Sequence, residues 1–170
     1  MNPPSANAAH RQGLQTLQEL VRDLEIAMVT TVTPDGALRS RPMFTREFND
    51  QGEIWFFTTD DSGTVDDIAS EQAVNVSYAD PGKHRYVSVT GNAGIVRDRE
   101  RAQGLWSNQL KKYLPRGLDD PHLALLRVRV ETAEYWDTPT GTMLDLFKVG
   151  ETAPRPEHGK VPVRAVPASG

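Results

Sequence analysis

The sequence predicts a mainly β protein, a small antiparallel barrel with short helices on its flanks. Three observations support this fold class. Six segments are rich in β-branched and aromatic residues, as strands are. Turn sequences with Pro, Gly and Asn separate several of them, and the regular strand–helix–strand alternation of a parallel sheet is missing. With 170 residues, the chain is long enough for one domain with its own core.

The N-terminal half is expected to contain one helix and three strands. Apolar residues at spacings of three and four predict an amphipathic helix over 14–24. The turns Thr33–Gly36 and Asn49–Gly52 have the residues that connect antiparallel strands. The strands that these turns separate are expected over 26–32, 37–48 and 53–59.

The following segments predict three more strands and two helices. Ser62 is a suitable N-cap for a short helix over 63–71, and Asp98 begins a second helix that runs to about Tyr113. Gly91 and Gly94 indicate a bulge within a long strand. The three strands are expected over 74–80, 85–96 and 123–136.

The two ends of the chain differ in composition from the middle. Residues 1–12 are expected to form a flexible arm, and residues 151–170, rich in Pro, Ala and Gly, a disordered tail. The folded domain is expected over 13–150. The N-terminus has no apolar stretch that resembles a signal sequence, and no apolar run could span a bilayer, so we expect a cytoplasmic protein without membrane contact.

The composition argues against several classes of function. The chain has no cysteine, which excludes disulfides, thiolate nucleophiles and iron–sulfur clusters. Its net charge of −4 argues against a broad nucleic-acid surface. The four histidines are scattered, so we expect no metal site. Neither a nucleophile elbow nor a glycine-rich phosphate-binding loop is present.

One pair of neighbouring strands combines residues suited to a flat anionic ligand. Arg41 offers a planar set of donors for a phosphate, and Pro42 interrupts the strand's hydrogen bonding so that nearby backbone groups are available to a ligand. The aromatic strand with Phe56 and Phe57 could supply an apolar wall for an isoalloxazine ring. An alternative remains open at this point, in which the aromatic residues are only core and Arg41 is an exposed strand residue.

Several longer runs carry a family resemblance. They recur in one order over about residues 15–150, which is far more specific than any single tetrapeptide. The sequence resembles the general stress protein 26 family of the pyridoxamine 5'-phosphate oxidase-like superfamily. The matching runs are AMVTTV (27–32), SRPM (40–43), WFFTT (55–59), NVSYADP (75–81), RYVSVTG (85–91), LWS (105–107), GLDDP (117–121), LALL (123–126) and AEYWD (133–137).

The resemblance implies a six-stranded antiparallel split β-barrel that binds FMN. It also implies a homodimer with flavin sites at the subunit interface, where Trp136 reaches the flavin of the partner. Trp106 could equally be a helix residue packed on the barrel. The implied cofactor-binding residues are Ser40, Arg41, Pro42, Met43, Phe56, Phe57, Thr58, Ser62, Thr64, Trp106 and Trp136.

The sequence departs from the family pattern at two lysines, where it has Thr64 and Thr142. Relatives use the first lysine to contact the FMN phosphate. The resemblance implies a flavin-dependent oxidoreductase with a reduced nicotinamide or similar small-molecule donor. Pyridoxamine phosphate oxidase activity itself is not expected, because the Arg-Leu-x-Pro terminal segment is missing. The alternatives are a non-catalytic flavin-binding or stress-response protein and a barrel for another ligand, such as a deazaflavin or haem-related molecule.

Overall fold

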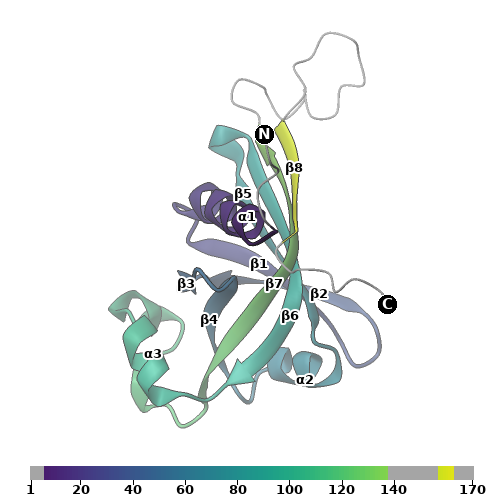
Figure 1. Ribbon diagram of the computed structural model, residues 1–170. Coiled ribbons are helices and arrows are strands. Elements are labelled where there is room, and N and C mark those ends of the chain that lie inside the picture. Colours follow the sequence, from purple (N-terminus) through teal and green to yellow (C-terminus); the bar gives the residue numbers. More distant parts are fainter. Residues whose placement is uncertain (1–5, 138–156, 163–170) are drawn as a thin grey trace.

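The computed structural model describes residues 6–137 and 157–162, which form one strongly curved sheet with helices around it (Figure 1). Its elements in chain order are α1 (Ala6–Val21), β1 (Ile26–Val32), β2 (Leu38–Phe44), β3 (Glu47–Phe48), β4 (Glu53–Thr59), α2 (Gly63–Ser70), β5 (Ala73–Asp80), η1 (Pro81–Lys83), β6 (Arg85–Val96), α3 (Arg99–Leu105), η2 (Asn108–Lys112), η3 (Gly117–Asp119), β7 (Leu123–Asp137) and β8 (Glu157–Pro162). The elements labelled η are short 3₁₀ helices.

The sheet is antiparallel throughout and does not close. Its strands follow the order β2-β1-β5-β6-β7-β4-β3, and β8 pairs with β7. Among the described strands, β2 forms a ladder only with β1. Because β2 and β4 share no ladder, the curved sheet keeps an open seam between them. This confirms the mainly β split barrel that the sequence predicts.

Long strands and one bulge produce the curvature. β6 and β7 pair over most of their length, and the register shifts between Thr90 and Gly91. A Cβ atom at Gly91 would lie only 2.3 Å from the carbonyl oxygen of Arg129, so the two backbones approach too closely there for any other residue. The predicted bulge is therefore present at Gly91.

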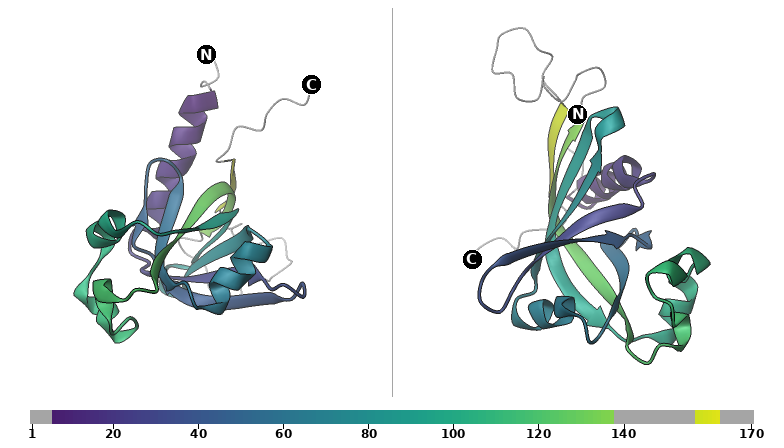
Figure 2. Two further views of the ribbon diagram at one scale, coloured as in Figure 1. Left: turned by 90° about the horizontal axis from the view of Figure 1, so that it is seen from below. Right: turned by 180° about the vertical axis from the view of Figure 1, so that it is seen from behind.

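Two hydrophobic clusters share strand β4. Ile54 and Phe56 are fully buried in the main core, together with the apolar face of α1. Trp55 and Phe57 point to the opposite side of the strand, into a second cluster with residues of α3, η2 and β7. Because both faces of β4 are buried, its sequence is a continuous run of apolar residues from Ile54 to Phe57. In both views of Figure 2, α3 and the turns after it project from the sheet as a separate lobe.

Several predicted boundaries are corrected by the structure. The helix begins at Ala6, within the expected flexible arm, because alanines and polar residues continue the helix beyond its apolar stripe. The helix predicted from Asp98 to about Tyr113 is α3, and it already ends at Leu105. Trp106 is extended, and Ser107 begins a new 3₁₀ turn. The expected strand 37–48 is divided into β2 and β3.

The expected disordered tail contains β8, which pairs with β7 from Thr132 to Asp137. Val161 packs against the main core, close to Gly13 of α1. The described strands therefore number eight rather than six. Among residues 6–137 and 157–162, no helix is both long and apolar enough to cross a bilayer.

Candidate functional site

A cavity of about 400 Å³ lies at the open seam of the barrel. It is enclosed by strands β1, β2 and β4, by the start of α2, and by the lobe that contains η2. This volume is in the range of small-molecule sites. The lining residues are Ile26, Arg41, Pro42, Met43, Phe44, Phe57, Thr58, Thr59, Thr64, Leu110, Tyr113 and Leu114.

The backbone of β2 forms one rim of this cavity. Because β2 ends the sheet, the backbone groups on its outer edge have no partner strand among the described residues. Pro42 lies in the middle of β2 and is tolerated there because an edge strand needs no donor at that point. The edge therefore offers hydrogen-bonding groups to a ligand.

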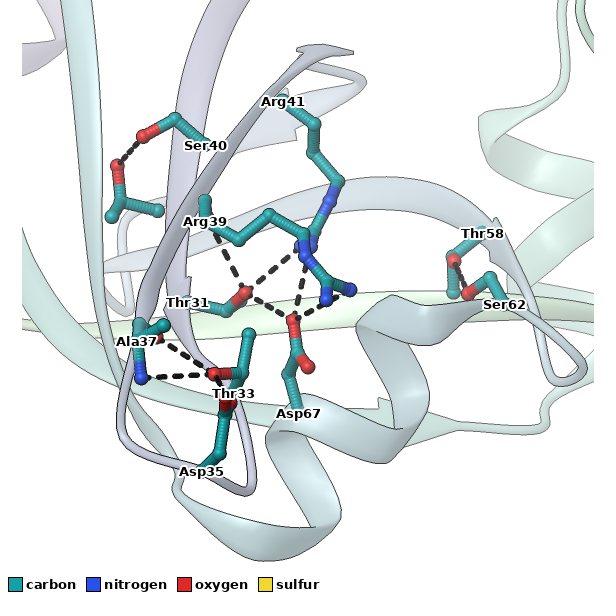
Figure 3. A network of polar contacts seen from close by, with 11 residues as sticks. Thr31, Thr33, Asp35, Ala37, Arg39, Ser40, Arg41, Thr58, Ser62 and Asp67 are labelled. Carbon is teal, nitrogen blue, oxygen red and sulfur yellow. Dashed lines mark hydrogen bonds and ion pairs between the residues drawn. The ribbon is translucent and has the colours of Figure 1, made fainter.

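Arg41, which forms the polar end of the cavity, is held by a buried carboxylate that does not itself line the cavity (Figure 3). Asp67 of α2 is 2% exposed and accepts hydrogen bonds from the Thr31 hydroxyl at 2.6 Å and from Nη2 of Arg41 at 3.0 Å. Nη1 of Arg41 also donates to the Thr31 hydroxyl at 3.0 Å. Figure 3 shows the side chains of Arg39 and Arg41 both reaching from β2 toward Asp67. Arg41 is thus held in place before any ligand binds.

The pKa of Asp67 reflects a competition between burial and its partners. Burial alone raises the pKa of this carboxyl group, but the hydrogen bonds from Thr31 and Arg41 and the charge of Arg39 outweigh it. The net effect lowers the pKa below the ordinary value of 3.8. Asp67 is therefore ionised at neutral pH and keeps both guanidinium groups oriented toward it.

Aromatic and aliphatic side chains form the opposite end of the cavity. Phe57 contributes from β4, and its ring meets the ring of Trp106 edge to face, with centroids 5.4 Å apart. Tyr113 follows η2 and lies 5.0 Å from the ring of Phe44. Tyr113 is 63% exposed, so part of its ring faces solvent at the cavity. This end is suited to the face of a flat, apolar ring.

The cavity brings together six of the predicted site residues. Thr58 and Thr64 line the cavity although both residues are largely buried, and the Thr58 hydroxyl bonds the hydroxyl of Ser62. The six that line the cavity are Arg41, Pro42, Met43, Phe57, Thr58 and Thr64.

Three other predicted residues are close in sequence but do not line the cavity. The Ser40 hydroxyl bonds the Thr30 hydroxyl, because alternation turns Ser40 away from Arg41. By the same alternation, Phe56 lies in the main core. Ser62 occupies the N-cap position of α2, yet its hydroxyl bonds Thr58 rather than capping the helix.

The last two predicted residues, Trp106 and Trp136, also do not line the cavity. Trp106 packs behind the cavity wall, against Phe57. Trp136 lies near the end of β7, whereas Ala124 near its start pairs with Thr58. Trp136 is not among the residues that line the cavity, and its contact with a partner's flavin stays a prediction.

Sequence reasoning missed two groups of site residues. Asp67 and Thr31 support Arg41 from elements distant in sequence, and no local pattern identifies such partners. Leu110 of η2, with Tyr113 and Leu114 directly after it, closes the cavity from the opposite side. Their spacing of three and four residues indicates an apolar helical face, but its position opposite β2 depends on the fold.

Comparisons with known proteins agree with this architecture. Residues 12–153 match the family model described as pyridoxamine 5'-phosphate oxidase like. Protein bli-3 of Neurospora crassa is 28% identical over 134 residues, which cover 73% of this chain. The match spans 64% of that protein's length.

Solved structures show the same fold. The general stress protein 26 from Bacillus anthracis is 23% identical, with a TM-score of 0.63, and the match covers 76% of this chain and 95% of that one. The general stress FMN/FAD binding protein from Xanthomonas citri is also 23% identical, with a TM-score of 0.65 and coverage of 78% and 94%. The match to the family model extends over most of the residues that form the barrel and its cavity. The chain therefore belongs to the pyridoxamine 5'-phosphate oxidase like family, as the sequence predicts.

Proposed function

We propose that the cavity binds FMN, with the ring against the apolar end and the phosphate at Arg41. The observation that carries this proposal is the composition of one cavity of about 400 Å³, which combines aromatic walls, a free strand edge and a pre-oriented guanidinium. These are the groups that a flat ring with polar edges and an anionic tail requires. The family match and the FMN/FAD binding relative support the same ligand.

The chain's own residues would bind and orient the cofactor rather than perform acid–base chemistry. Within the described part of the chain, the cavity lining contains no carboxylate, imidazole or amine. When bound, FMN supplies hydride and electron transfer. We therefore propose a flavin-dependent oxidoreductase that uses a reduced nicotinamide or similar small-molecule donor.

A non-catalytic flavin-binding protein is the second candidate, and Thr64 at the position of the family's phosphate-binding lysine favours it, because it weakens the anchoring of the phosphate. The two candidates differ in turnover. Protein loaded with FMN should consume NADH or NADPH steadily in the presence of an acceptor if it is an oxidoreductase. A fully loaded sample that consumes neither donor above the rate of free FMN would favour binding alone.

A homodimer would complete the site. Ile26, Met28 and Leu38 are 50%, 42% and 75% exposed, and strand alternation with the register of β1 and β2 places them on one face. An exposed apolar face of this kind marks a contact surface. A partner seated there would cover the cavity edge at Ile26, and it could bring its own Trp136 to the flavin. Light scattering that finds only monomer at micromolar concentration would contradict this arrangement.

The ring position can be tested with Tyr113→Ala. Removing one aromatic wall contact of about 0.5–1.5 kcal/mol should weaken binding roughly two- to twelvefold. FMN and riboflavin should be affected alike, because both carry the ring. Gln109→Ala is the control, since it removes an exposed side chain of η2 that does not line the cavity. Fluorescence quenching titrations with unchanged affinity in Tyr113→Ala would place the ring elsewhere.

A further inference from the structure

Two guanidinium groups share one carboxylate at the polar end of the cavity. Nη2 of Arg41 lies 3.0 Å from Oδ2 of Asp67, and Nη1 of Arg39 lies 3.8 Å from the same oxygen. Arg39 and Arg41 are two residues apart on β2, so their side chains leave the same face of the strand. Two cations around a single anion leave one net positive charge at this point.

The guanidinium of Arg39 lies against the first turn of α2. A Cβ atom at Gly63 would be 3.0 Å from Nη1 of Arg39, closer than most real contacts. Gly63 therefore leaves the space into which this guanidinium extends. The next residue, Thr64, is buried and lines the cavity. Arg39 is not among the lining residues, but Gly63, against which its guanidinium lies, directly precedes the lining residue Thr64.

The other partners of Arg39 leave its charge available. Its side chain is 54% exposed, and its distance to Asp67 is long for an ion pair. Asp35 also senses the charge of Arg39, but the carboxylate of Asp35 accepts its hydrogen bond from the Thr33 hydroxyl. Among the described residues, the ion-pair partner of Arg39 is therefore Asp67 at 3.8 Å, which Arg41 contacts more closely.

We propose that Arg39 is a second phosphate-binding residue, which with Arg41 forms a two-guanidinium clamp organised by Asp67. This inference rests on the proposed function, since the ligand is the phosphate of FMN. A phosphate provides several acceptor oxygens and enough negative charge for two guanidinium groups. Asp67 reduces the repulsion between the two cations and orients both. The clamp puts a cation beside Thr64, where the family resemblance leads one to expect a lysine.

The test compares FMN with riboflavin, which has the same ring and no phosphate. Arg39→Gln should weaken FMN about five- to twentyfold, the lower part of the range for a charge-assisted bond because the site is half exposed. The affinity for riboflavin should not change. Arg99→Gln is the matched control, because Arg99 is 65% exposed, lies 4.0 Å from a carboxylate and does not line this cavity. It should alter neither affinity.

Gly63→Leu tests whether the guanidinium occupies the proposed space. The new side chain should displace Arg39 and weaken FMN to a similar extent. The double variant Arg39→Gln/Gly63→Leu should then bind FMN no more weakly than either single variant, because both changes remove the same contact. Additive losses would overturn the proposed contact between these positions.

The outcomes separate the inference from the proposed function. If wild-type protein binds FMN more tightly than riboflavin and Arg39→Gln keeps this preference unchanged, the clamp is wrong and the flavin site stands. If wild-type protein binds both flavins equally, the phosphate is not recognised and the clamp is wrong as well. If wild-type protein binds neither flavin, the proposed function and the clamp both fail.

Discussion

Replacement of Arg41 by alanine should destabilise the fold and also weaken the binding of FMN. The structure gives the reason, because Asp67 is 2% exposed and would lose one of its bonded partners. A hydrogen bond to a charged group contributes about 1.5–3 kcal/mol. Thr31 and Arg39 remain beside Asp67, so we expect a loss of about 1–2 kcal/mol in the free energy of unfolding.

Urea denaturation at pH 7 measures this loss directly. With an m-value of about 2 kcal/mol per molar urea, the midpoint should fall by roughly 0.5–1 M. Arg85→Ala is a matched control, since Arg85 is similarly exposed but its partner Asp137 is 20% exposed. Arg85→Ala should lower the free energy of unfolding by less than Arg41→Ala does, because water can solvate the carboxylate of Asp137.

The double variant Arg41→Ala/Asp67→Asn identifies the cause. Removing the buried charge should recover much of the stability lost in Arg41→Ala, a coupling within the range of about 0.5–3 kcal/mol for contacting residues. The free energy of unfolding should also depend on pH, because the pKa of Asp67 is lowered in the folded state. Its ionised form contributes stability above pH 3.8, and this contribution is lost as pH falls through the folded-state pKa. The difference between wild type and Arg41→Ala should therefore shrink in acid. Wild-type stability in Arg41→Ala, or strictly additive losses in the double variant, would refute the reasoning.

Three further predictions concern other parts of the fold. Gly91→Ala should cost about 1–3 kcal/mol by overpacking, whereas Gly94→Ala, which meets nothing within 4 Å, should cost clearly less in the same thermal melts. Deletion of residues 157–170 should lower the melting temperature by several degrees, because it removes β8 and the packing of Val161; an unchanged value would show that β8 is dispensable. The hydrogen bond to Asp60 at 2.8 Å raises the pKa of His122 above 6.5, so its stabilising contribution is complete below pH 6.5 and is lost as pH rises through the folded-state pKa. An NMR titration of His122 should show this raised pKa in wild type and a lower one in Asp60→Asn.

The barrel strands could be predicted because their signals are local. β1 and β4 have the predicted bounds, since β-branched or aromatic runs end there at turn residues. The segment that forms β8 has no run of β-branched or aromatic residues of this kind. It forms an edge of the sheet by pairing with β7, and only the folded arrangement brings the two segments together.

The candidate site was predictable in part for the same reason. Arg41 and Pro42 lie in one short motif, and the cavity contains both. In the sequence, no local pattern distinguishes Asp67 from the neighbouring Asp66. The structure gives them different roles, because the helix turns Asp67 inward to Arg41 while Asp66 remains exposed. This orientation depends on how α2 packs under β1 and β2, which no local pattern specifies.

Equilibrium dialysis of the protein against FMN, read by flavin absorbance, decides whether the cavity is a flavin site. We expect a stoichiometric excess of flavin on the protein side, with an absorption spectrum shifted from that of free FMN as the ring enters the apolar end of the cavity. Tyr113→Ala should retain less flavin at the same free FMN concentration, and Gln109→Ala, which changes an exposed side chain outside the cavity, should retain the wild-type amount. Equal FMN on both sides of the membrane, or full retention by Tyr113→Ala, would contradict a flavin site between β2, β4 and η2.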